Sequence, residues 1–192
     1  MILNSLSGGV CSSAMALLHP KIPNIVVNTG GNLPEAWDTI YQLQKKGLKI
    51  LTISSFLQGY PTYYEYIKED KVPFYKSCSH KAKQIHLNKL ASIFRPITYN
   101  IGIVQGEKER VDEWGDPPSF IKYNFPMLTY TREQCEKVLR THGVTANKSG
   151  CWFCGKQPKS SWEWLKETHP DKFEEARVKG WLPKSMIVGD KQ

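Results

Sequence analysis

The chain has 192 residues, of which 40% are apolar and 11% aromatic, so it can bury one compact core and is not a disordered chain. A formal net charge of +8 favours an anionic partner, either a nucleotide or a nucleic-acid backbone, without choosing between them. No apolar segment is long enough to span a membrane and no secretion signal opens the chain, so we expect a cytoplasmic protein without membrane contact.

Short apolar runs alternate with helical segments through the first two thirds of the chain. A helix is predicted at 10–18. A second one opens at Pro34 and ends at Gly47, because proline suits the first turn of a helix and glycine its C-cap. The predicted strands are 2–6, 25–27, 48–53 and 97–104. This alternation predicts an α/β fold, a doubly wound, mostly parallel sheet whose ligands bind at the carboxyl ends of the strands.

The last third of the chain has a different character. A helix is predicted at 131–142, with Thr131 as its N-cap and Gly143 as its stop. A compact turn with two cysteines follows at 149–155, and another helical stretch at 161–179. We therefore expect an α/β domain at 1–125 and a helical extension at 126–192 that packs on it.

A turn of small residues, SGGVCSS at 7–13, separates the first predicted strand from the first helix. Glycines let a backbone approach an oxyanion closely, and the helix that follows points free N–H groups at the same place. The hydroxyls of Ser7, Ser12 and Ser13 add further donors. A turn of this composition is also common structural punctuation, so the stretch alone does not separate an anion site from a plain turn.

Five cysteines, an odd number, indicate metal or redox chemistry in a reducing compartment rather than a disulfide framework. The CxxC spacing of Cys151 and Cys154 suits two ligands on one metal. Cys78 and Cys135 are the candidates to complete the site, and four thiolates suit zinc or an iron–sulfur cluster equally well. The alternative for Cys135 is a small apolar residue on the buried face of its helix.

Two further groups of side chains allow a functional and a structural interpretation. The basic residues around Cys78 are typical of a solvated helix face. The tyrosines in 60–66 are suited to stacking bases, but they are more typical of filling beneath a loop. Arg110 suits bidentate phosphate binding, and Glu107 either orients it or caps a turn. The aromatic residues near the CxxC are expected to pack around that turn.

Several stretches, in the same order along the chain, resemble the phosphoadenosine phosphosulfate (PAPS) reductase-like family, a branch of the adenine nucleotide alpha-hydrolase (PP-loop) superfamily. SGGVCSS at 7–13 resembles the SGGxDS pyrophosphate loop, and Asn28-Thr29-Gly30 with Pro34-Glu35 is similar to DTG…PE. Cys78-Ser79…Lys83 resembles C-[ST]-x-x-x-K, and 102–110 resembles G-I-R-x-x-E-x-x-R. TREQC at 131–135 and SGCWFC at 149–154 resemble the C-terminal part of compact, often phage-borne relatives.

The resemblance implies a nucleotide enzyme that carries out sulfonucleotide reduction or nucleotide-dependent sulfur transfer. It implies an adenine nucleotide, ATP or PAPS, and places Cys78 and Cys135 near the CxxC. Similar sulfurtransferases carry a [4Fe–4S] cluster on such cysteines, which favours a cluster over zinc. The implied catalytic residues are Cys11, Lys83 and Arg110; the implied nucleotide-binding residues are Ser7, Gly8, Gly9, Ser12, Ser13, Asn28, Thr29, Gly30 and Glu107; the implied metal ligands are Cys78, Cys135, Cys151 and Cys154.

The chain departs from the family pattern at three positions. Cys11 and Asn28 stand where the family has aspartates, and Val104 stands where it has an arginine. Loss of two carboxylates weakens the case for Mg²⁺-assisted attack on ATP, because hard cations prefer oxygen ligands. The chain also lacks the tail cysteine of authentic PAPS reductases. The alternative function is a degenerate nucleotide fold with a structural zinc that recognises nucleic acid or a protein. Two further expectations concern partners: a nucleic acid as the acceptor substrate, and a second copy of the chain in a homodimer.

Overall fold

The computed structural model describes residues 1–70, 80–114, 116–147, 149–183 and 186. A five-stranded sheet lies at its centre, with strand order β3-β2-β1-β4-β5 and parallel pairing throughout. The strands are β1 (Ile2–Ser5), β2 (Asn24–Asn28), β3 (Ile50–Ser54), β4 (Ile97–Ile101) and β5 (Ile121–Asn124). The predicted parallel α/β fold is confirmed, and β5 at one edge is the strand that sequence patterning did not find.

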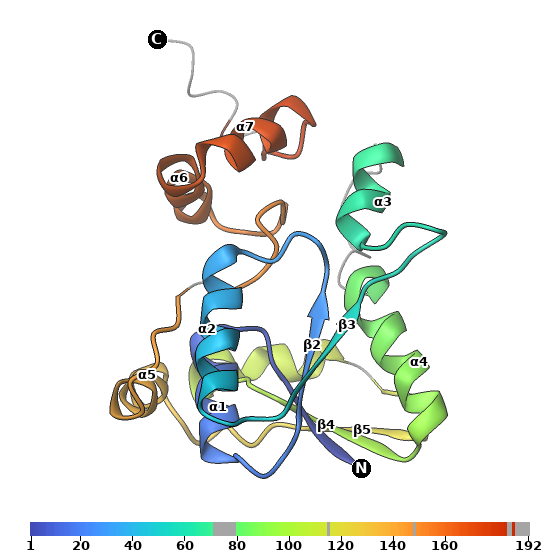
Figure 1. The fold of residues 1–192 in the computed structure, drawn as a ribbon, viewed down its shortest axis with the longest axis vertical. Coiled ribbons are helices and arrows are strands. Elements are labelled where there is room, and N and C mark those ends of the chain that lie inside the picture. Colours follow the sequence, from blue (N-terminus) through green and yellow to red (C-terminus); the bar gives the residue numbers. More distant parts are fainter. Residues whose placement is uncertain (71–79, 115, 148, 184–185, 187–192) are drawn as a thin grey trace.

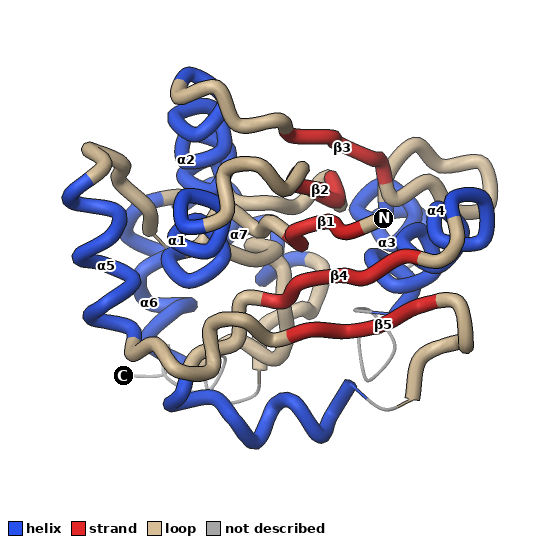
Figure 2. Tube along the Cα trace, turned by 90° about the horizontal axis from the view of Figure 1, so that it is seen from below, coloured by secondary structure: helices blue, strands red, loops and turns tan. Residues whose placement is uncertain are grey.

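Helices cover both faces of this sheet. They are α1 (Val10–Leu18), α2 (Pro34–Lys45), α3 (Tyr63–Asp70), α4 (Ile85–Phe94), α5 (Arg132–Thr141), α6 (Lys159–Thr168) and α7 (Pro170–Val178), with a π-helical turn at His80–Gln84 and a 3₁₀ segment at Gln105–Trp114. Helices α1, α2 and α5 lie on one side of the sheet and α4 on the other (Figure 2). Helices α6 and α7 lie beyond the end to which β2 points (Figure 1).

The alternation of side chains along each strand explains why both faces of the sheet are buried. Val26 of β2 belongs to the apolar cluster beneath α1 and α2, whereas Ile25 and Val27 belong to the cluster beneath α4. Successive side chains of a strand point to opposite faces, so an uninterrupted apolar run is what a strand covered on both sides requires.

Most of the helix ends predicted from local sequence signals are confirmed. Helix α1 has the predicted bounds, and α2 opens at Pro34 as expected. Thr131 and Gln134 form a capping box at the start of α5. The stretch predicted as one helix at 161–179 is two helices, because His169 leaves the helical region (φ −138°, ψ 67°) and Pro170 begins α7.

An asparagine ladder crosses four strands on the α1 side of the sheet. Asn124 donates to Asn100 (2.9 Å), and Asn100 donates to Asn4 (2.9 Å). Asn4 donates to Asn24 (3.2 Å), which in turn donates to the carbonyl of Lys49 (3.2 Å). The asparagines in each pair are register partners, and Asn4, Asn24 and Asn100 are buried. The sheet therefore carries a buried polar row whose donors and acceptors match in this alignment of the strands.

The C-terminal third contributes to two cores. Helix α5 packs on α1, and its Cys135 and Leu139 share a cluster with Met15. Trp162 of α6 and Phe173 of α7 belong to another cluster, which includes residues of α3. The domain boundary expected at 125/126 stays a prediction. In the part of the chain that the structure describes, no helix has the length and apolar character needed to cross a bilayer.

Candidate functional site

A cavity of about 1240 Å³ opens where β1 and β4 end. Ser5 and Ile101, the last residues of these two strands, both line it. After β1 the chain builds the sheet outward through β2 and β3, and it then returns to place β4 on the other side of β1. The cavity therefore lies at the point where the strand order reverses, which is the preferred ligand site of open parallel sheets.

The loop after β1 is held in place by two close backbone approaches. Gly8 has a φ of +76°, and a Cβ there would overlap the carbonyl oxygen of Ala36 in α2. A Cβ on Gly102, just after β4, would lie 2.9 Å from the Cα of Ser12. Glycine at both positions lets the loop, α2 and the end of β4 converge.

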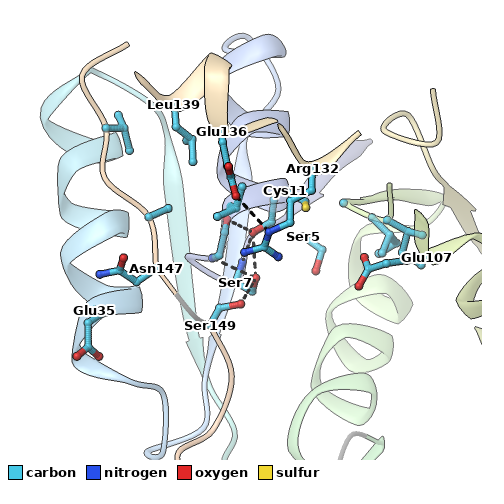
Figure 3. A pocket seen from close by; sticks show the side chains of 18 of the residues that line it. Ser5, Ser7, Cys11, Glu35, Glu107, Arg132, Glu136, Leu139, Asn147 and Ser149 are labelled. Atoms are coloured by element: carbon cyan, nitrogen blue, oxygen red, sulfur yellow. Dashed lines mark hydrogen bonds and ion pairs between the residues drawn. The ribbon is translucent and has the colours of Figure 1, made fainter. Parts of the chain in front are cut away.

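Serine hydroxyls from two distant segments lie together beside the loop, and Figure 3 shows Ser7 next to Ser149. Ser7 Oγ lies 2.9 Å from Ser12 Oγ and 3.2 Å from Ser149 Oγ, and Ser149 comes from the C-terminal extension. No side chain caps the N-terminus of α1, and no acidic residue lies in its first turn. The free N–H groups of α1 and these hydroxyls together suit an anion such as a phosphate.

Of the loop residues expected to bind the nucleotide, Ser7, Gly9 and Ser12 line the cavity, whereas Gly8 and Ser13 do not. Ser13 is fully buried, and its hydroxyl has no hydrogen-bond partner among the described residues. Ser149 is a lining residue that the sequence analysis missed as a ligand, although it begins the SGCWFC stretch.

Four cations line the cavity, against three carboxylates. Lys83 and Arg110 are the two that the sequence motifs indicated, and Arg132 and Arg140 of α5 are the two that they did not. The spacing of Arg132, Glu136 and Arg140 by four residues places all three on one helix face, which is the signal that could have revealed them. Glu107 also lines the cavity and pairs with Arg110 at 2.6 Å, and Arg132 pairs with Glu136 at 3.2 Å.

Cys11 lies in the first turn of α1, lines the cavity and is partly exposed. A hydrogen bond from the Cys135 thiol lowers the pKa of Cys11 to about 7, against the raising effects of burial and of Glu107, and the positive charge of Arg132 also lowers it. The same interaction, together with burial, raises the pKa of Cys135. Cys11 is therefore the thiol of this pair that ionises near neutral pH.

We expect iodoacetamide to alkylate Cys11 with a rate that rises through a midpoint near pH 7 rather than near 9.0. A lowered pKa means that the reactive thiolate is already present above pH 7. The rate is measured by mass spectrometry of the Cys11 peptide across a pH series, with Cys11→Ser as the control for labelling elsewhere. A midpoint at or above 9.0 would contradict the hydrogen bond from Cys135.

The turn at 28–30 is not brought into this cavity. Asn28 lines a separate cavity of about 330 Å³ beside Trp37, and its side chain accepts a hydrogen bond from the N–H of Gly30 (2.9 Å). Thr29 Oγ1 lies 2.8 Å from Asn32 Oδ1 and 3.1 Å from the sulfur of Cys151. The turn, which was expected to bind the nucleotide, therefore contacts the cysteine turn of the extension.

The expected cysteine site is not assembled among the described residues. Cys151 and Cys154 share one turn, in which the N–H of Cys154 donates to the carbonyl of Cys151 (3.1 Å). Cys135 lies against Cys11 between α1 and α5, and no three Cys, His, Asp or Glu side chains in the described ranges converge as metal ligands. Cys78 lies outside the described residues. Two thiolates are fewer than zinc or a [4Fe–4S] cluster requires, so no chemistry is derived through a metal.

Glu35 joins the cavity wall to the extension. Its Oε1 lies 2.8 Å from Nε2 of His169, and Trp164 packs edge-on against that imidazole at 5.6 Å. The two residues lie 134 positions apart along the chain, so no local sequence pattern predicts this contact. The tyrosines of α3 lie, as favoured, in an apolar cluster: Tyr64 stacks on Phe153 at 5.7 Å beside Trp152.

No protein-family model matches the sequence, and no curated protein matches it either. Solved structures do share its fold. The U34-tRNA thiolase NcsA from Methanococcus maripaludis, with its [4Fe–4S] cluster, is 17% identical with a TM-score of 0.56, over 100% of this chain and 72% of that one. A PAPS reductase from Candida auris, in a phosphate complex, is 12% identical with a TM-score of 0.60, over 80% of this chain and 82% of that one. The resemblance drawn from the motifs is confirmed at the level of the fold.

Proposed function

We propose that the protein is an enzyme that binds an adenine nucleotide, with PAPS as the preferred candidate, and reduces its sulfuryl group with a thiol of the cavity. The observation that carries the proposal is the position of Cys11, an ionisable thiol within the anion loop and beside Arg132. The fold shared with a PAPS reductase supports this assignment.

The carboxylates that line the cavity already pair with basic side chains, and this favours thiol chemistry over Mg²⁺-assisted chemistry. Glu107 and Glu136 are paired with arginines, and Glu35 is paired with His169 through Oε1, while its Oε2 is buried without a hydrogen-bond partner among the described residues. A magnesium site is usually built on one or two carboxylates that are free to bind the ion. In the proposed complex the loop N–H groups and serine hydroxyls hold a phosphate, and the cations neutralise the charge that develops on it during transfer.

Replacing Arg132 with alanine is expected to weaken PAPS binding roughly tenfold, about 1.4 kcal/mol, because one charge-assisted contact is lost. Isothermal titration calorimetry with PAPS and with ATP measures the effect. Lys21→Ala removes an exposed cation at the opposite end of the sheet and is the matched control, with affinity near wild type. If neither nucleotide binds while RNA or DNA does, the enzyme proposal fails and the alternative of a nucleic-acid-binding module takes its place.

Sulfur transfer to a nucleic acid is the second candidate. It is favoured by the net charge of +8 and by the fold likeness to a tRNA thiolase along the whole chain. The two reactions differ in their products: reduction of PAPS releases sulfite, and sulfur transfer leaves a thiolated nucleoside. Sulfite release with PAPS alone distinguishes them.

We propose that any bound metal is held by Cys151 and Cys154, with Cys78 as a further ligand, and not by Cys135. Cys151→Ser is then expected to lower the metal content of anaerobically purified protein, whereas Cys135→Ser leaves it unchanged, because the structure separates Cys135 from the CxxC turn. Inductively coupled plasma mass spectrometry gives the content, and absorbance near ~400 nm separates iron–sulfur from zinc. Loss of metal in Cys135→Ser would contradict the separation.

A further inference from the structure

Strand β3 forms one edge of the sheet, and among the described residues it pairs with β2 alone (Figure 2). The N–H of Ser55 and the carbonyl of Lys49 both bond to the backbone of β2. Because backbone groups alternate in direction along a strand, the N–H and C=O groups of Ile50, Thr52 and Ser54 point away from β2 in the plane of the sheet. Within the described structure, this edge therefore presents a row of unpaired donors and acceptors, which is a template for a further strand.

The side chains of β3 do not protect this edge. Natural proteins shield exposed edges with charged side chains, prolines or bulges. Residues 50–54 (ILTIS) include no charge and no proline, and Leu51 is 49% exposed. The opposite edge strand β5 differs, because it exposes the charged side chain of Lys122. Of the two edges of the sheet, β3 is thus the one open to pairing.

We propose that two copies of the chain form a dimer in which β3 pairs with β3 of the partner, antiparallel, about a two-fold axis at Thr52. This register places Thr52 opposite the partner's Thr52 and Ile50 opposite the partner's Ser54, so every outward N–H and C=O group of β3 gains a partner. Leu51 then lies opposite the partner's Ile53 at a non-hydrogen-bonded position, where facing side chains approach most closely. The pairing joins the two sheets into one continuous sheet, and it does not depend on the proposed function.

Charges on α2 favour a second copy of this chain over a strand of another protein. Asp38 and Lys45 are exposed on α2, about two turns apart on the same helix face. Neither forms an ion pair within the described residues. Tyr41 lies between them along the helix, is 55% exposed, and lines a cavity of about 330 Å³ together with Thr52. The exposed face of α2 therefore lies beside the open edge of β3.

The two-fold axis matches these charges. Helix α2 connects the parallel strands β2 and β3, so it runs antiparallel to both, and the axis brings the α2 helices of the two copies together in opposite directions. The acidic end of each helix, at Asp38, then meets the basic end of the other, at Lys45. Tyr41, near the midpoint of this face, lies closest to the axis. The surface is complementary to itself, as an interface with two-fold symmetry requires.

Sedimentation equilibrium of the full chain across a concentration series tests the dimer, and the wild-type protein is expected to be dimeric at the upper end of the series. Thr52→Pro removes the central outward N–H but leaves the bonds to β2, and proline is tolerated at such an edge position. Leu51→Lys places an unpaired charge in the joint. Each change is expected to raise the dimer dissociation constant roughly tenfold or more. Lys122→Asp, a charge reversal on the other edge, is the matched control and is expected to dimerise as the wild type.

A charge exchange on α2 tests the arrangement of the two copies. Asp38→Lys and Lys45→Asp each place like charges against one another, and each is expected to weaken the homodimer about tenfold. An equimolar mixture of these two variants restores opposite charges at both contacts and is expected to form a heterodimer. The double variant Asp38→Lys/Lys45→Asp restores them within one sequence and is expected to regain wild-type association. A general loss of folding cannot produce either rescue.

Three outcomes would overturn the proposal. A protein that stays monomeric throughout the series excludes the second copy and leaves the edge to a strand of another protein. A dimer that Thr52→Pro and Leu51→Lys do not weaken uses a different surface. A mixture of the two charge variants that associates no better than each variant alone contradicts the antiparallel two-fold arrangement. Urea denaturation identifies any variant that fails to fold, and the charge exchange then decides.

Discussion

Replacing Gly8 with alanine is expected to lower the free energy of unfolding by roughly 2–5 kcal/mol, the sum of about 1–2 kcal/mol for a left-handed backbone and about 1–3 kcal/mol for overpacking. The φ of +76° penalises any side chain there, and the new methyl group would overlap the backbone of Ala36. Backbone cannot rotate aside as a flexible side chain can. The loop and the start of α2 must therefore separate, and the anion site should be lost with them.

Gly47→Ala is the matched control for this prediction. Gly47 also has a positive φ (+86°), but a Cβ there would meet nothing within 4 Å. Its replacement should cost only the backbone penalty, about 1–2 kcal/mol. Urea denaturation of both variants, with PAPS binding measured in parallel, separates the two contributions. Equal losses of stability would mean that the approach of the loop to α2 does not constrain Gly8.

Replacing Asn4 with leucine is expected to cost roughly 2–6 kcal/mol of unfolding free energy, because two buried polar groups at about 1–3 kcal/mol each lose their partners. Asn100 would lose the acceptor of its amide, and Asn24 would lose a donor to its carbonyl. Leucine is close to asparagine in shape, so the loss reports hydrogen bonding rather than a cavity. The free energy from urea denaturation is the measurement.

Asn124→Leu provides the comparison for the ladder. Asn124 ends the edge strand β5 and is exposed, so water can replace what its amide gives up. Its replacement should cost distinctly less than that of Asn4. If the two leucine variants lose the same stability, the buried ladder does not contribute as a hydrogen-bonded chain.

Local signals in the sequence predicted most of the fold and part of the site. The Gly-Gly turn, Pro34, Gly47 and the Thr131 cap depend on backbone geometry that neighbouring residues impose, and the structure has them in place. The edge strand β5 was missed because it has only four residues, two of them polar or charged at exposed positions. Its pairing with β4 depends on tertiary contacts, which no local sequence pattern predicts.

The site residues that the sequence analysis missed reach the cavity through contacts between segments that lie far apart in the sequence. Arg132 and Arg140 reach the cavity because α5 packs on α1. Their spacing places them on one helix face, but nothing near them in the sequence specifies which neighbour that face meets. The same packing places Cys135 between α1 and α5, whereas the family resemblance had implied a position near the CxxC. The asparagines of the ladder are poor strand formers taken singly, so only their alignment across four strands explains them.

The contact of Ser7 with Ser149 joins residues 142 positions apart. During synthesis, the strand and helix on either side of the glycine turn leave the ribosome long before Ser149 does. Contacts of such separation form slowly, because the intervening chain must first be ordered. The anion site that we propose is therefore incomplete until Ser149 has been synthesised, and we expect its full affinity for an anion to require docking of the segment that carries Ser149.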